Sequence, residues 1–393
     1  MVRKLMTTAA LLLVVGCFIP RVMATGRSTA ELQASTPPRS STHKHTSIRT
    51  EDDQWTWQEK DDDKRLEVTI RGHVEFADDY SDIKSISDGG WIKVIDESGG
   101  MSRKFEATAT AAGLQRAYWV NGQSRTFDQE ARTWLAKILD DTVRQGGYDA
   151  RPRVQRILRE RGPSGVLQEI SRLKGDYVKR IYFDELINSG NLDDQTVRTV
   201  LHQAASEIHS DYEKAQLLIK MSDNYLVNDS QRAIYLEGVS TLHSDYEKGR
   251  TLGALLKKGN LSPENLLFAL RAAGSISSDY ERAQLLIKIA GAYTLDERAR
   301  AAYMEAVATI RSDYEKGRVL SAILKKGEPH RETLLFALKS ASSISSDYEK
   351  AQLLMKVAAI GSSDEAVRAA LIDSARTIRS EYERGRVLSA VFK

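Results

Sequence analysis

The chain has 393 residues, of which 28% are charged and 41% are hydrophobic, and its net charge is only +3. This composition excludes a largely disordered chain and a multi-span membrane protein, and the small net charge argues against binding of nucleic acid through bulk electrostatics. Cys17 is the only cysteine, so the sequence offers no internal disulfide and no cysteine-based zinc site.

Residues 1–24 have the pattern of a secretory signal peptide. Arg3 and Lys4 precede an apolar stretch over residues 5–15, which is too short for a typical membrane span. Two interpretations of its end stay open. "VVGC" resembles a lipobox in which Cys17 is lipidated, whereas "VMA" at residues 22–24 fits an ordinary cleavage site. Both predict export to the periplasm or cell envelope, with a lipid anchor as the only attachment to a membrane.

Residues 25–54 are rich in Ser, Thr, Arg and Pro, which predicts a disordered linker. His43 and His45 in "HKH" are metal-ligand types, but no other ligand lies near them in the sequence, so we expect a solvated linker and no metal.

Residues 55–127 alternate between apolar and polar side chains, as in "RLEVTIRGHVEF". Period two with turn signals such as "DGG", "SGG" and "NG" predicts about four to six antiparallel strands in a small β domain. Residues 128–175 then switch to helical periodicity. Ala131, Trp134, Leu135 and Ile138 form one apolar stripe, and two short helices follow, the second with Pro163 in its first turn. We interpret this region as a helical adaptor.

Residues 176–393 repeat a sequence of 34 residues, with motif serines at Ser210, Ser244, Ser278, Ser312, Ser346 and Ser380. A degenerate copy, "GDYVKR", begins near residue 176, and the last copy is half a unit. This period predicts an α-solenoid in which each unit is a pair of helices. The predicted fold class is therefore α+β and mostly α, with a small antiparallel β domain before an α-solenoid of helix-hairpin repeats.

The recurring "SDYEK" has the spacing of a capping box. Each serine is expected to accept a hydrogen bond from the backbone N–H three residues on, and each glutamate to accept one from the serine N–H. Tyr212, Ala215 and Ile219 are spaced to face inward in the first full unit. The capping residues are Ser210, Glu213, Ser244, Glu247, Ser278, Glu281, Ser312, Glu315, Ser346 and Glu349.

The residue after each serine is acidic, so stacked units would carry a candidate acidic ridge of Asp211, Asp245, Asp279, Asp313, Asp347 and Glu381. A basic line runs beside it, made of Lys214, Lys248, Arg282, Lys316, Lys350 and Arg384. Because the two signs are interleaved, we expect these charges to pair within and between units. A calcium site would need six or more oxygens around one ion, which no loop provides.

Successive units alternate between "DYEKA" and "DYEKG", so the full period is a pair of units. Glycine in mid-helix costs about 1 kcal/mol relative to alanine. The recurrence of Gly249, Gly317 and Gly385 therefore predicts a close approach of helices in every second unit. The final half unit leaves one side of the array uncovered, which favours self-association at that end.

Taken together, "GHVEFADDYSDIKSIS", "GGWIKVID", "ARTWLAKIL" and the recurring "SDYEK" resemble an extracytoplasmic region. That region follows the membrane peptidase domain in some BlaR-type regulatory metallopeptidases and also occurs in stand-alone exported bacterial proteins. The resemblance covers most of the chain after Trp55 and implies a helical-repeat fold in the cell envelope. It implies no peptidase activity here, because H-E-x-x-H is absent from the sequence.

These patterns predict a non-enzymatic exported scaffold that binds a protein or peptide, with no nucleic acid and no cofactor. A first alternative is a sensory, ligand-binding input domain of an envelope or antibiotic-response system. A second is an envelope hydrolase. For that role the densest acidic and histidine set is Asp78, Asp79 and Asp82 with His73, although "ADDYSD" also fits a turn between strands.

Overall fold

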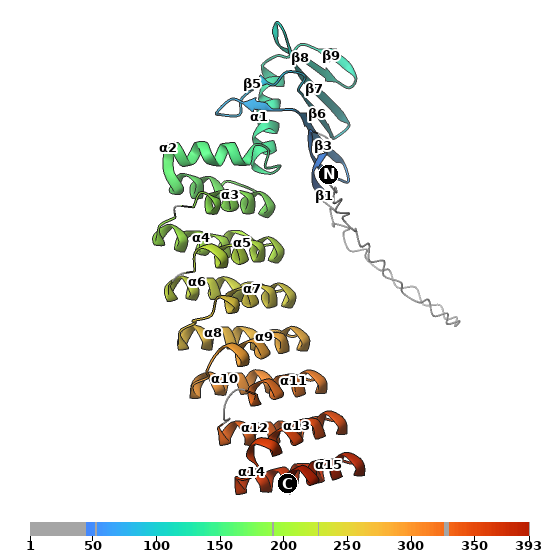
Figure 1. The fold of residues 1–393 in the computed structure, drawn as a ribbon. Helices are drawn as coiled ribbons and strands as arrows, with labels where there is room; N and C mark the ends of the chain where they lie inside the picture. Colours follow the sequence, from blue (N-terminus) through green and yellow to red (C-terminus); the bar gives the residue numbers. More distant parts are fainter. Residues whose placement is uncertain (1–44, 52, 191, 227, 326–329, 393) are drawn as a thin grey trace, which may run out of the picture. The chain divides into compact units, whose positions relative to one another are not determined.

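The structure, a computed structural model, describes residues 45–51, 53–190, 192–226, 228–325 and 330–392 (Figure 1). An antiparallel sheet comes first, and helices arranged in repeated pairs follow it. The predicted fold class, α+β and mostly α with an α-solenoid, is confirmed.

Seven strands form one antiparallel sheet in the order β1-β2-β3-β6-β7-β8-β9, and β4 and β5 form a separate hairpin. On β3, Val68 and Ile70 are buried opposite Val94 and Ile92 of β6, as the alternation predicts. The strands are β1 His45–Glu51, β2 Gln54–Asp61, β3 Lys64–Arg71, β4 Val74–Phe76, β5 Ile83–Ile86, β6 Trp91–Ser98, β7 Met101–Thr110, β8 Gly113–Val120 and β9 Gln123–Arg125.

Two expectations about this region are wrong. The linker was expected to extend over residues 25–54, but β1 occupies His45–Glu51, because Ile48 pairs with Trp57 and packs against the sheet core. Four to six strands were expected over residues 55–127, but eight strands, β2 to β9, occupy this part of the described chain, since a short strand such as β9 carries no apolar residue by which it could be recognised. His45 begins β1. Cys17, His43 and the rest of residues 1–44 lie outside the described residues.

Helix α1, Gln129–Arg144, packs its apolar stripe against the sheet, with Leu135 and Leu139 completely buried. Its N-cap is Asp128, whose carboxylate accepts a hydrogen bond from the Ala131 N–H. The indole N–H of Trp134 donates to the carboxylate of Asp96 on β6 over 2.7 Å. The predicted stripe therefore covers one face of the sheet.

The turn after α1 fixes the sheet to the helices. The hydroxyl of Tyr148 accepts a hydrogen bond of 2.9 Å from the Val74 N–H, and its ring centroid lies 5.1 Å from that of Trp55. Burial raises the pKa of Tyr148 to about 12. At Gly146, a Cβ would lie 2.9 Å from the ring of Trp55, so only glycine permits this approach.

The two short helices expected after this turn are joined in α2, Ala150–Ile170. They meet at Gly162, which has φ +67° and non-helical geometry, and Pro163 follows it as predicted. The buried Arg153 donates to Glu169 over 2.7 Å and so links the two segments.

The remaining helices form two rows (Figure 1). The odd row contains α3, α5, α7, α9, α11, α13 and α15, and the even row contains α4, α6, α8, α10, α12 and α14. One continuous apolar core lies between the rows. The helices are α3 Asp176–Asn188, α4 Asp194–Glu207, α5 Asp211–Asn224, α6 Asp229–Ser240, α7 Asp245–Lys258, α8 Pro263–Gly274, α9 Asp279–Ala292, α10 Glu297–Ala308, α11 Asp313–Leu324, α12 Arg331–Ala341, α13 Asp347–Gly361, α14 Glu365–Arg376 and α15 Glu381–Val391.

Candidate functional site

Each motif serine starts a helix of the odd row. Ser210 has extended backbone angles, φ −66° and ψ 116°, and its hydroxyl accepts from the Glu213 N–H at 3.4 Å. The same contact recurs at Ser244, Ser278, Ser312, Ser346 and Ser380. Helix α3 differs because Gly175 occupies the N-cap and offers no side-chain oxygen.

Each motif aspartate holds the next repeat unit. The Oδ2 atom of Asp211 accepts hydrogen bonds from the backbone N–H groups of His243 and Ser244, at 2.8 and 2.6 Å. Burial opposes ionisation of Asp211, but these N–H donors outweigh it and lower the pKa of the carboxyl. Equivalent contacts are made by Asp176, Asp245, Asp279, Asp313 and Asp347.

The candidate acidic ridge is thus a series of contacts between units. Glu381, its last member, makes no such contact among the described residues. In the same part of the chain, no three His, Cys, Asp or Glu side chains are grouped so that they could hold a metal ion.

The motif glutamates do not complete a capping box, which corrects that expectation. The serine N–H that each would accept from is already donated to the aspartate of the preceding unit. Glu247 instead pairs with Arg250 at 2.7 Å, one turn along the same helix. Glu315 and Glu383 pair in the same way with Arg318 and Arg386, and Glu213 pairs with Arg180 of the preceding unit.

The other two motif glutamates lie beside recurring glycines of the preceding odd-row helix. A Cβ on Gly249 would lie 2.7 Å from the Oε2 atom of Glu281, and one on Gly317 would lie 3.4 Å from that of Glu349. The close approach predicted from the glycines is therefore observed at Gly249, whereas a Cβ on Gly317 would make an ordinary van der Waals contact. At Gly385 nothing lies within 4 Å of the added atom.

The motif lysines are mostly buried between the rows. Lys214 is 4% exposed, and its ammonium group donates to the Ala205 carbonyl and the Thr241 hydroxyl, at 3.1 and 2.8 Å. These acceptors lie at the C-terminal ends of two even-row helices, where a cation stabilises the helix dipole. Burial lowers the pKa of Lys214. Arg282, Lys316 and Lys350 are also buried and donate to equivalent hydroxyl groups.

The motif tyrosines are the exposed members of the motif. The tyrosine row comprises Tyr177, Tyr212, Tyr246, Tyr280, Tyr314, Tyr348 and Tyr382, and their exposed fractions run from 42% to 74%. The inward orientation expected for Tyr212 is wrong. In α5 the buried side carries Ala215, Leu218 and Ser222, and Tyr212 faces away from it in the first turn.

From α5 onwards, the side chain four residues after each tyrosine of the row alternates between arginine and glutamine from one helix to the next. The guanidinium of Arg250 lies 5.6 Å from the ring centroid of Tyr246, and Arg318 and Arg386 stack in the same way on Tyr314 and Tyr382. The "DYEKA" helices carry glutamine at the corresponding position, for example Gln352. The face therefore presents aromatic rings flanked by cationic and amide donors.

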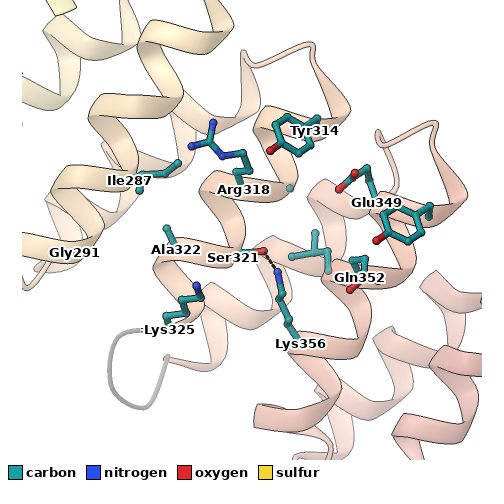
Figure 2. Close-up of a pocket in the computed structure, with 13 residues that line it drawn as sticks. Ile287, Gly291, Tyr314, Arg318, Ser321, Ala322, Lys325, Glu349, Gln352 and Lys356 are labelled. Atoms are coloured by element: carbon teal, nitrogen blue, oxygen red, sulfur yellow. Dashed lines mark hydrogen bonds between the residues drawn. The ribbon is translucent and has the colours of Figure 1, made fainter. Parts of the chain in front are cut away.

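A pocket of about 730 Å³ opens beside this row, between α9, α11 and α13 (Figure 2). Tyr314 and Tyr348 line it, and small residues such as Gly317 and Ala322 leave the space open. Figure 2 shows Tyr314 and Arg318 on α11, with Lys325 and Lys356 farther along the pocket. Lys356 donates to the Ser321 hydroxyl over 2.7 Å.

The carboxylates considered for a hydrolase make hydrogen bonds and ion pairs with neighbouring side chains. Asp79 accepts from Ser81 in a turn, Asp78 pairs with Arg156, and Asp82 pairs with Arg116 and Arg132. The carboxylates of all three are used in structural contacts. The backbone N–H of His73 donates to the hydroxyl of Ser87.

Comparison of the chain with known protein families, with curated proteins and with solved structures finds no match in any of the three. Within the described residues, no helix has the length and apolar character required to cross a membrane.

Proposed function

We propose that this protein is a non-enzymatic scaffold that binds a protein or peptide along the tyrosine row. The observation that carries the proposal is that each residue of the repeated motif has its own structural role. Serine and aspartate make backbone contacts, glutamate and lysine are paired or packed, and the tyrosine stays about half exposed in every unit. Exposed aromatic residues on a rigid surface are typical of the residues that dominate binding energy.

Export to the cell envelope is part of the same proposal, and its support is the pattern of residues 1–24 together with the resemblance to exported helical-repeat regions. A scaffold in that compartment would present its partner-binding face outside the cytoplasm. A sensory role would use the same face.

A triple variant of the row tests the scaffold proposal. Replacing Tyr246, Tyr280 and Tyr314 by alanine should abolish capture of the partner from an envelope extract, because aromatic anchors lose their contact area. The measurement is cross-linking capture with the purified full chain, followed by quantitative mass spectrometry.

The matched control replaces Glu237, Arg271 and Glu305 by alanine. All three are exposed on the even row, and this control should capture as much partner as the wild type. The proposal fails if the tyrosine variant, shown to be folded by circular dichroism, captures the same proteins in the same amounts as the wild type.

A further inference from the structure

We propose that the tyrosine row binds an extended, proline-rich peptide that carries acidic side chains and adopts the polyproline II conformation. This inference rests on the proposed scaffold function and names its ligand. Three features of the odd row support it: the spacing of the rings, the hydrogen-bond donors of the pocket and the positive charge that several of these donors carry.

The spacing comes from helix packing. One tyrosine occupies the same position in the first turn of successive odd-row helices, so the row runs across the helices. Neighbouring packed helices lie about 8–10 Å apart. A polyproline II helix advances about 9.3 Å per turn, at three residues of about 3.1 Å each. One face of such a ligand therefore meets a new tyrosine at each turn, and about eighteen residues would span the six intervals of the row.

The pocket wall supplies donors. Arg318, Lys325, Lys356, Gln352 and the tyrosine hydroxyls are all able to donate hydrogen bonds into the space between α11 and α13. A polyproline II backbone makes no internal hydrogen bonds, and each proline has a carbonyl group but no N–H. Such a ligand offers acceptors and almost no donors, which matches this wall.

The lining of the pocket contains residues that suit a proline ring. Small residues, Gly291, Gly317 and Ala322, line it together with the aromatic side chains of Tyr314 and Tyr348. Grooves lined by aromatic residues are the usual binding surfaces for proline-rich segments, since the ligand loses little conformational entropy on binding.

The positive charges that line the pocket favour a ligand with acidic side chains. Among the described residues that line it, the cations are Arg318, Lys325 and Lys356, and the one carboxylate is Glu349. Arg318 pairs with Glu315, but neither Lys325 nor Lys356 has an acidic partner within 4 Å among the described residues. Positively charged surfaces select negatively charged ligands and accelerate their association.

Tyrosines and cations equivalent to those of the pocket recur 68 positions earlier in the chain. Tyr246 and Tyr280 correspond to the two tyrosines of the pocket, and Arg250, Lys257 and Lys288 correspond to its three cations. Within the described residues, Lys257 and Lys288 likewise have no acidic partner within 4 Å. The binding face is therefore periodic, and a long ligand would meet equivalent contacts twice.

The experiment measures binding of the full chain to three labelled peptides of eighteen residues by fluorescence anisotropy. The first repeats Pro-Pro-Glu, the second repeats Pro-Pro-Lys, and the third repeats Gly-Ser-Glu, which keeps the acidic charge without the polyproline II conformation. We expect the first peptide to bind at least about tenfold more tightly than either of the others.

The variant Tyr314→Ala/Tyr348→Ala should weaken binding of the Pro-Pro-Glu peptide by at least about tenfold, and the even-row control should leave it unchanged. Equal binding of the Gly-Ser-Glu peptide would show that charge alone is recognised and would overturn the inference, as would unaltered binding by the tyrosine variant. Failure of all peptides, with partner capture still lost in the row variant, would refute this ligand and leave the scaffold function standing.

Discussion

Asp211→Ala is expected to lower the free energy of unfolding by about 3 kcal/mol at pH 7. The substitution removes the acceptor of two backbone N–H groups of the next repeat unit, and hydrogen bonds to a charged acceptor contribute about 1.5–3 kcal/mol each. The measurement is urea denaturation followed by far-ultraviolet circular dichroism.

The loss of stability caused by Asp211→Ala should become smaller as the pH is lowered. The folded-state pKa of Asp211 is lower than its unfolded value of about 3.9, so the stabilisation is complete above that value. The part of it that depends on ionisation is lost as the pH falls through the folded-state pKa, because both states then bind the proton. The difference in stability between wild type and variant should therefore narrow as the pH falls below about 4.

Two controls isolate this effect. The imidazole Nδ1 of His243 lies 3.6 Å from Asp211, so the comparison is repeated in a His243→Ala background. Asp373→Ala removes an exposed carboxylate that pairs with Arg376 on the same helix, and its expected cost is below about 0.5 kcal/mol. If Asp211→Ala cost no more than Asp373→Ala, the contact between units would not stabilise the array.

Tyr235→Ala is expected to destabilise the fold by about 3–5 kcal/mol, the range found for removal of a large buried ring. Tyr235 on α6 is completely buried, and its hydroxyl donates to the Thr251 carbonyl of α7 over 2.9 Å. Burial raises the pKa of this hydroxyl, so it remains a donor at neutral pH. Tyr235→Phe should cost only about 1 kcal/mol, because it removes the hydrogen bond and keeps the ring.

A second tyrosine serves as the matched control. Tyr246 is 58% exposed on the neighbouring helix α7, and Tyr246→Ala should change the free energy of unfolding by less than about 0.5 kcal/mol. Urea denaturation of all three variants gives the comparison. Similar losses for Tyr235→Ala and Tyr246→Ala would contradict the separation of buried structural tyrosines from the exposed tyrosines of the row.

The sequence predicts the helical part of the fold well, because its signals are local. Each repeat unit was expected to be a pair of helices, and in the first full unit α5 and α6 occupy Asp211–Asn224 and Asp229–Ser240. Serine caps and apolar spacing act within one helix and are visible in a single unit. Strand β1 was missed because its stability comes from pairing with β2, which neighbouring residues along the chain do not reveal.

The candidate site was harder to predict, since its residues act between units. The role of Asp211 depends on N–H groups that lie more than thirty positions away in the sequence, and the outward direction of Tyr212 depends on which side of α5 the even row covers. One signal in the sequence could have indicated the outward direction of Tyr212. The tyrosine recurs without change in successive units, although Ala215 and Leu218 already fill the buried side of the helix.

The aspartate contact is the same at successive boundaries between repeat units, so these boundaries are interchangeable. At each boundary, the same aspartate oxygen accepts hydrogen bonds from the same two backbone N–H groups. A duplication or deletion of one 68-residue block therefore leaves matching partners on both sides of the cut. Recombination can therefore lengthen or shorten the protein without redesign of its core. Each added block would extend the tyrosine row by two rings, so the length of this exposed aromatic surface is a property that evolution, or an engineer, can set by gene duplication.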